Sequence, residues 1–138
     1  MDFNDYIQIG GSLNQVIQLE GKVRDIITKE EKTVVLSECP IFITQDVLLA
    51  CNFTKGENDN EYICTLHVNN KTCVIICTYL SIKKTYEMRL TGFKKSVIPI
   101  KEIEVLSDLQ DWVRVNAGME LTVDENKLAE AVKKQLII

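Results

Sequence analysis

One histidine, His67, and five cysteines are the side chains of this chain that could act as a base, a nucleophile or soft metal ligands. A catalytic thiol needs a base and a group that orients that base. No such set accompanies His67 in a recognisable motif, although a fold could bring a distant cysteine to it. Cys73 and Cys77 share a face of a predicted strand but stand roughly 13 Å apart, too far to bind one zinc ion. We expect no metal site, and we interpret His67 as a solvent-facing side chain.

Glycines and paired carboxylates give no stronger sign of catalysis. The six glycines form neither a Gly-x-Gly-x-x-Gly nor a Walker-type run, so no phosphate-binding loop is predicted. The acidic pairs Glu30–Glu31 and Asp124–Glu125 fall in a predicted turn and a predicted helix cap, where carboxylates are solvated or structural. The sequence therefore predicts a protein that is not an enzyme, with no catalytic residue, no cofactor and no evident small-molecule substrate.

The stretch from Lys83 to Lys101 is the best candidate for binding a polyanion. It holds six basic residues and one acid, a net charge of +5, whereas residues 102–130 hold eight acids and two basic residues, a net charge of −6. Aromatic side chains beside lysines and arginines can stack on bases and neutralise phosphates. The alternative is a solvated sheet face, which the acidic helices could even cover; the overall pI of about 5.1 favours this alternative. The candidate nucleic-acid-binding residues are Lys83, Lys84, Tyr86, Arg89, Phe93, Lys94 and Lys95.

A β-hairpin over residues 61–80 is the clearest structural element in the sequence. Apolar and polar residues alternate before Asn69-Asn70, and asparagine tolerates the positive φ that a two-residue hairpin turn requires. The second arm is apolar on both faces from Cys73 to Cys77, which is typical of a central strand or of a closed barrel. The predicted register pairs Val68 with Lys71, Leu66 with Cys73, Cys64 with Ile75, and Tyr62 with Cys77.

Residues 12–20 fit either a short helix or the start of a strand over residues 16–27, and their β-branched content favours the strand. The segment Ile17-Gln-Leu-Glu-Gly-Lys-Val-Arg-Asp-Ile26, a charged turn, and Thr33-Val-Val-Leu-Ser-Glu-Cys39 together resemble the opening hairpin of Sm-like barrels and of OB-folds. The resemblance covers residues 17–39 and implies a small β-barrel. The Arg-Gly motif that precedes the last strand of Sm-like proteins is missing, so no functional residue is carried over.

Two further strand pieces are predicted at residues 41–43 and 47–53, and another strand at 86–90. Helices follow. Ser107 is the predicted N-cap of the first helix, which ends at Gly118, and the segment Thr122-Val-Asp-Glu125 is the predicted capping box of the second.

The composition is that of one ordinary globular domain. The chain has 138 residues, of which 46% are hydrophobic and 26% charged, and no apolar run reaches the roughly 18 residues that span a membrane. The start of the chain is acidic and lacks the apolar region of a secretory signal, and the odd number of cysteines indicates free thiols. We therefore expect an intracellular protein in a reducing compartment, cytoplasm or nucleus.

These elements predict an α+β fold: a strongly bent antiparallel sheet or small β-barrel of about six strands, followed by two C-terminal helices. We expect a single domain over residues 1–138, with a β-rich part (1–106) and a helical part (107–138).

The functional hypothesis is a non-enzymatic protein-interaction subunit of a larger assembly, with a protein partner or a second copy of itself. Trp112 is either the anchor of its helix on the sheet or an interface residue, a role in which tryptophan is enriched. The alternatives are a nucleic-acid-binding barrel and a small acidic inhibitor or immunity-type antagonist. The candidate partner-binding residues are Leu109, Trp112, Val113, Leu136, Ile137 and Ile138.

Overall fold

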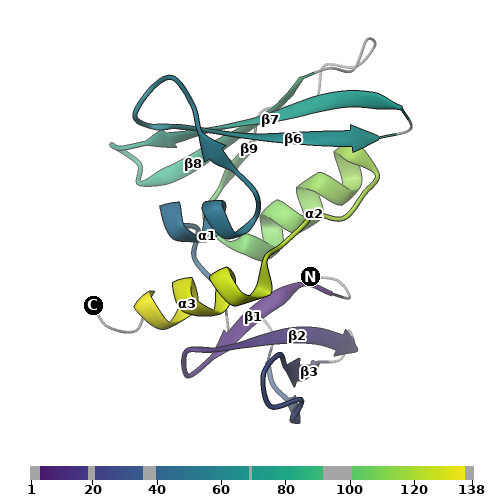
Figure 1. Cartoon of the computed structure of the whole chain (residues 1–138). Coiled ribbons are helices and arrows are strands. Elements are labelled where there is room, and N and C mark those ends of the chain that lie inside the picture. The colour runs from purple at the N-terminus through teal and green to yellow at the C-terminus, as the bar shows by residue number, and fades with distance from the viewer. Residues whose placement is uncertain (1–3, 19–20, 36–39, 69, 92–100, 136–138) are drawn as a thin grey trace.

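The computed structural model describes residues 4–18, 21–35, 40–68, 70–91 and 101–135. It confirms an α+β fold, with two antiparallel sheets and three helices in these residues. Figure 1 shows the helices lying between the two sheets, so the molecule has a sheet, a helical layer and a second sheet. None of the helices in these residues has the length and apolar composition needed to cross a membrane.

The larger sheet contains the predicted central hairpin. Its five strands run in the order β5 (Thr54–Lys55), β6 (Glu61–Val68), β7 (Lys71–Leu80), β8 (Thr85–Thr91) and β9 (Lys101–Ile103). The hairpin register is confirmed at all four predicted pairs, from Val68 opposite Lys71 to Tyr62 opposite Cys77. Asn70 has a φ of 65°. This is the positive backbone angle that the turn requires and that asparagine tolerates.

Strand β7 is fully buried on only one face. Cys73, Ile75 and Cys77 are each at most 2% exposed and point into the core. Val74 and Ile76, on the opposite face, are only half-buried. The prediction that this segment is shielded on both faces is therefore wrong for the second face, because the helices pack against one side of the sheet alone.

The smaller sheet forms from the first part of the chain. Its strands run in the order β1 (Tyr6–Ile9), β2 (Ser12–Gln18), β3 (Lys22–Asp25) and β4 (Glu31–Thr33). The strand alternative for residues 12–20 is confirmed over β2, but a continuous strand from 16 to 27 is not. Gly21 turns the chain there with a φ of 110°, and a Cβ at this position would meet the carbonyl oxygen of Val34.

The predicted single sheet or barrel of about six strands is replaced by these two separate open sheets. A six-residue helix, α1 (Gln45–Ala50), stands in the chain between them, and the two C-terminal helices α2 (Leu106–Ala117) and α3 (Glu125–Gln135) pack in the space between them. A barrel fills its interior with its own side chains. Here the main core is instead filled from the helices as well as from both sheets.

Helix α1 corrects the predicted strand over residues 47–53. Thr44 has extended backbone and its hydroxyl accepts a hydrogen bond from the Val47 N–H at 3.3 Å, which makes it an N-cap. Val47, Leu48 and Ala50 are buried on one side. An apolar run this short cannot be assigned to helix or strand from its periodicity, and the cap decides it.

The caps of the two C-terminal helices differ from those expected. Helix α2 begins two residues earlier than predicted, because its N-cap is Val105, which makes no side-chain cap. Ser107 lies inside the helix. Its end at Gly118, with a φ of 68°, is confirmed. At α3 the Asp124 carboxylate, not Thr122, accepts the N–H groups of Asn126 and Lys127, at 3.1 and 3.2 Å.

Polar contacts join α2 to the smaller sheet. The Arg114 guanidinium lies 2.5 Å from Oδ1 of the fully buried Asp5 and 2.7 Å from Oε1 of Glu120. The Tyr6 N–H donates to Gln110 Oε1 at 3.0 Å. Because removing either member of a buried ion pair leaves the other charge uncompensated, these contacts fix how the smaller sheet sits on the helices.

Candidate interaction site

The Trp112 helix does not present a docking face. Leu109 and Val113 are fully buried, and Trp112 is 5% exposed within the main core. The prediction that these three residues bind a partner stays untested. Their burial on the covered, apolar side of α2 fits the alternative, in which Trp112 anchors its helix on the sheet. The remaining predicted partner-binding residues, Leu136, Ile137 and Ile138, lie outside the described residues.

The basic stretch is partly neutralised by its own sheet. Lys83 Nζ lies 2.8 Å from Glu102 of β9, and this carboxylate raises the pKa of the lysine. Arg89 lies 3.0 Å from Glu87 on the same strand. Lys84 is exposed in the β7–β8 turn. The acidic partners of Lys83 and Arg89 therefore lie on β9 and β8, not on the C-terminal helices, which were one possible cover for these strands.

The described aromatic residue of this stretch, Tyr86, is not free for stacking on bases. Tyr86 packs against Tyr79, with ring centroids 5.0 Å apart. Tyr86 is partly buried against the core, and this burial raises the pKa of its hydroxyl to about 12. Phe93, Lys94 and Lys95 lie outside the described residues. The described part of the stretch thus offers two paired cations, two further exposed lysines at 84 and 101, and no exposed aromatic side chain.

The buried thiols at the end of α1 and in the larger sheet are protonated at neutral pH. Burial raises the pKa of Cys51 to about 12, of Cys64 to about 11 and of Cys77 to about 12. Since the thiolate is the reactive form, these cysteines behave as small apolar side chains. In the described ranges no three histidine, cysteine or carboxylate side chains come together as metal ligands. His67 is exposed, and its Nδ1 lies 3.4 Å from the Thr72 hydroxyl.

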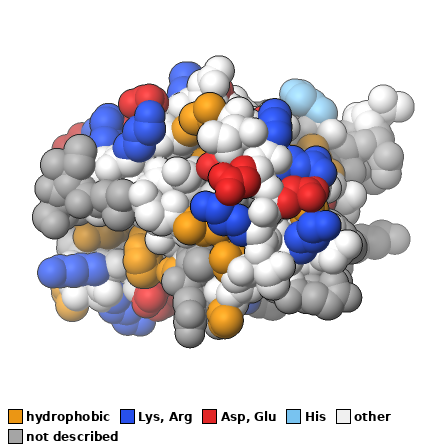
Figure 2. All heavy atoms as spheres, turned by 90° about the horizontal axis from the view of Figure 1, so that it is seen from below, with side chains coloured by type: hydrophobic (Ala, Val, Ile, Leu, Met, Phe, Trp, Pro, Cys, Tyr) orange, Lys and Arg blue, Asp and Glu red, His pale blue; other side chains and the backbone are white. Residues whose placement is uncertain are grey.

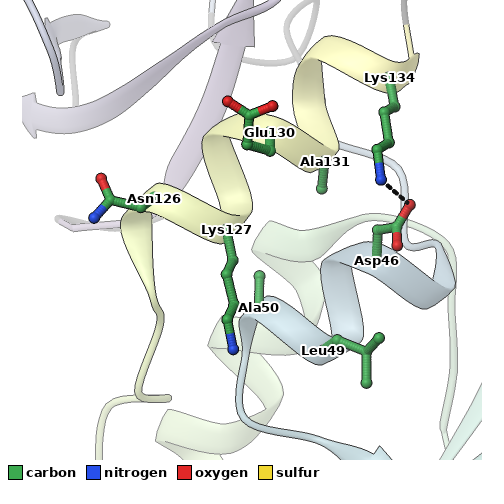
Figure 3. Close-up of a pocket in the computed structure, with 8 residues that line it drawn as sticks. All are labelled: Asp46, Leu49, Ala50, Asn126, Lys127, Glu130, Ala131 and Lys134. Carbon is green, nitrogen blue, oxygen red and sulfur yellow. Dashed lines mark hydrogen bonds and ion pairs between the residues drawn. The ribbon is translucent and has the colours of Figure 1, made fainter.

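A groove lies between α1 and α3. It has a volume of about 400 Å³. Figure 3 shows the side chains that line it, with Ala50 and Ala131 facing each other between the two helices. Both alanines are almost completely buried, while Leu49 beside them is 38% exposed. The apolar floor is therefore narrow: Ala50 and Ala131 are closed off where α1 and α3 pack together, and Leu49 supplies most of its exposed apolar surface.

The rim of the groove carries both signs of charge. Lys134 Nζ of α3 lies 3.5 Å from Asp46 Oδ2 of α1 across one end. Lys127 extends along the groove toward α1, and Glu130 projects from the far side of α3 (Figure 3). All four side chains are exposed. Charged pairs this exposed contribute roughly 0–1 kcal/mol each to stability, so they can exchange partners with a bound molecule at little cost.

A second exposed apolar side chain lies close to the end of α3. Phe42 is 55% exposed, and its carbonyl oxygen accepts a hydrogen bond from Gln135 Nε2 at 2.8 Å. The sequence continues after Gln135 with Leu-Ile-Ile. Periodicity gave no sign of the groove because it joins residues such as Asp46 and Lys134, 88 positions apart. The sequence does hold one local signal for α1, which is Thr44 as a possible N-cap before an apolar run.

Charges on the side of the smaller sheet are mixed. Figure 2 shows basic and acidic side chains interspersed on this face, with hydrophobic side chains in small patches between them. Glu31 illustrates the pattern, since it lies 3.0 Å from Arg24 and 3.6 Å from Lys22. A face with interleaved charges does not favour the binding of a polyanion or of a strongly basic enzyme.

Comparison with known proteins adds no relative. The chain matches no protein-family model, no curated protein sequence and no solved structure. The resemblance to Sm-like and OB barrels therefore stays a prediction, and the function has to be argued from the site itself.

Proposed function

We propose that this chain is a non-enzymatic protein-interaction subunit that binds a partner in the groove between α1 and α3. The observation that carries the proposal is the combination of an apolar floor at Leu49, Ala50 and Ala131 with an exposed rim of both charges. Apolar pockets of this kind, rimmed by polar groups, are typical of protein-binding sites. The buried, protonated thiols support a scaffold rather than a catalyst.

A peptide segment fits the groove better than a small molecule does. Small-molecule sites usually combine an apolar cavity with a few fixed polar groups that orient the ligand. The polar groups here are mostly the ends of long, exposed side chains such as Lys127 and Lys134. Two helices that flank an apolar floor instead suit one amphipathic helix, whose aliphatic side chains enter the groove while its flanking charges meet the rim.

Partner capture with a matched pair of variants tests the proposal. Leu49→Arg places a charge over the groove floor, and Val115→Arg places the same charge on α2 at a residue that is 82% exposed and does not line the groove. Both tagged variants and the wild type are captured from the native cell after nuclease treatment and compared by quantitative mass spectrometry.

We expect at least one protein to be retained by the wild type and by Val115→Arg and lost from Leu49→Arg. If every captured protein is retained equally by both variants, the groove is not the binding site. Circular dichroism of the purified variants shows whether each is folded, so that loss of binding is not confused with unfolding.

Nucleic-acid binding is the second candidate, and the exposed Lys84 with the positive net charge of residues 83–101 is what favours it. Fluorescence anisotropy with labelled single strands at low salt distinguishes it, because phosphate binding weakens steeply as salt is added. Binding that Lys83→Ala/Lys84→Ala reduces would favour this candidate. The third, an acidic inhibitor, requires salt-sensitive binding to a basic enzyme, and the face on the side of the smaller sheet, which carries both signs of charge, does not favour it.

A further inference from the structure

One edge of the larger sheet is open. Strand β5 pairs with β6 only at Tyr62 and Ile63. The chain before β5 turns away at Asn52, which has a φ of 65°, and the Phe53 N–H donates to the carbonyl of Leu48 in α1 at 3.1 Å. The second half of β6 therefore continues past the end of its neighbour.

Two backbone hydrogen bonds at the start of β6 show which backbone groups face that edge. The Glu61 carbonyl accepts the Gly56 N–H at 2.7 Å, on the β5 side, while the Asn60 carbonyl accepts the Tyr79 N–H of β7 at 2.8 Å. Because successive peptide groups of a strand point to opposite edges, the odd-numbered residues of β6 face outward. Thr65 and His67 thus aim an N–H and a C=O each at the open edge. Within the described part of the chain no backbone group pairs with them there, and both residues are exposed.

The other sheet edges are protected. Strand β4 is three residues long and carries Glu31 and Lys32, and β9 is equally short and carries Lys101 and Glu102. The side chain of Gln110 occupies the edge of β1 by accepting the Tyr6 N–H. Short strands, charges and covered edges are the devices by which proteins prevent strand pairing.

The open part of β6 uses none of these devices. It reads Cys-Thr-Leu-His from residue 64 to 67, with no Asp, Glu, Lys, Arg or Pro in a chain that is 26% charged. We propose that this edge pairs with the same edge of a second copy of the chain, as antiparallel strands around a twofold axis. This homodimer is separate from the groove between α1 and α3.

Twofold symmetry fixes the register. An axis at Leu66 places Thr65 opposite His67 of the second copy, and His67 opposite Thr65 of the second copy. Both residues aim their N–H and C=O at the edge, so this register forms hydrogen-bonded pairs on both sides of the axis. The side chains of Thr65 and His67 lie on the exposed outer face, so they can be substituted without disturbing the core.

The test is the mass in solution, measured by sedimentation over roughly a hundredfold range of concentration. We expect the wild type to approach twice its monomer mass of 15.7 kDa as concentration rises. In Thr65→Lys/His67→Lys like charges face each other across the axis, and we expect the dimer dissociation constant to rise roughly tenfold or more. Thr72→Lys adds a lysine to the same face of the neighbouring strand, opposite His67 in the β6–β7 register, and we expect it to remain dimeric.

A charge swap then tests the register itself. Thr65→Glu/His67→Lys places a carboxylate opposite an ammonium group of the second copy on both sides of the axis, and we expect dimerisation to return. A wild type of 15.7 kDa at every concentration would overturn the proposal. So would a dimer that the two edge lysines leave unchanged, or a charge swap that is as monomeric as the double lysine variant. Leu49→Arg, which acts on the groove, is expected to keep the wild-type mass.

Discussion

Helices α2 and α3 look alike in sequence, yet the fold uses them differently. Both are amphipathic and of similar length, but seven residues of α2 are buried against four of α3. The reason is their place in the helical layer: α2 contacts β1 and β9, from both sheets, whereas α3 contacts α1 and β2. Helix α2 therefore has a structural role, although its Trp112 is a residue type that is enriched in interfaces. Helix α3 instead leaves the groove open.

This contrast predicts that substitutions in α2 reduce stability, whereas substitutions at the α1–α3 groove reduce binding. The largest effect is expected at Trp112. Trp112→Ala removes a large side chain from the main core, and we expect it to lower the free energy of unfolding by about 3–5 kcal/mol. Urea unfolding followed by circular dichroism measures this. Val115→Ala, on the exposed side of the same helix, should change stability by less than about 0.5 kcal/mol.

Arg114 tests the join between α2 and the smaller sheet. Arg114→Ala leaves the fully buried Asp5 without the guanidinium that lies 2.5 Å from it, and we expect a loss of about 3 kcal/mol. Amide hydrogen exchange should rise most in β1 and β2. Lys83→Ala breaks an exposed pair and is the control, with an expected loss of at most about 1 kcal/mol. Equal losses in both variants would show that the Asp5 contact is no stronger than a surface pair.

Alkaline pH tests the burial of the thiols. The pKa of Cys51 and Cys77 is raised from 9.0 to about 12 in the folded protein. Below pH 9 these thiols are protonated in both the folded and the unfolded state, so the stability that depends on their protonation is fully present. Above it the unfolded state loses its protons first, and stability falls by up to roughly 1.4 kcal/mol per pH unit for each thiol. Cys77→Ala should reduce this slope between pH 9 and about pH 11, and an unchanged slope would contradict the burial of Cys77.

The smallest stability effect is expected at the groove. Asp46→Asn breaks the 3.5 Å contact with Lys134, whose two side chains are 50% and 65% exposed. We expect the free energy of unfolding to change by less than about 0.5 kcal/mol, measured by the same urea unfolding. A loss as large as that of Arg114→Ala would mean that the groove is held together by this pair and is not free to accept a partner.

The sequence alone predicts what local patterns determine. The register of the β6–β7 hairpin follows from period-two alternation and the Asn-Asn turn, and the end of α2 follows from Gly118. Helix α1 is missed because six residues are too few for a helical period to show. The division into two sheets is missed because strand patterns do not say which strands pair across a long separation.

The candidate site shows the same limit. An amphipathic pattern reveals that Trp112 and Leu109 share a face, but not whether a sheet of the same chain or another protein covers it. Burial in the structure answers this for α2. The groove joins a helix of the β-rich part to a helix of the C-terminal part, so only the fold places Leu49 next to Ala131.

Photo-crosslinking in the native cell tests the docking groove most directly. A photoreactive amino acid replaces Leu49 in one variant and Val115 in another, and adducts are detected by gel shift and mass spectrometry. The account predicts a discrete protein adduct from position 49 that is absent from position 115. The same adducts from both positions, or none from position 49, would contradict it.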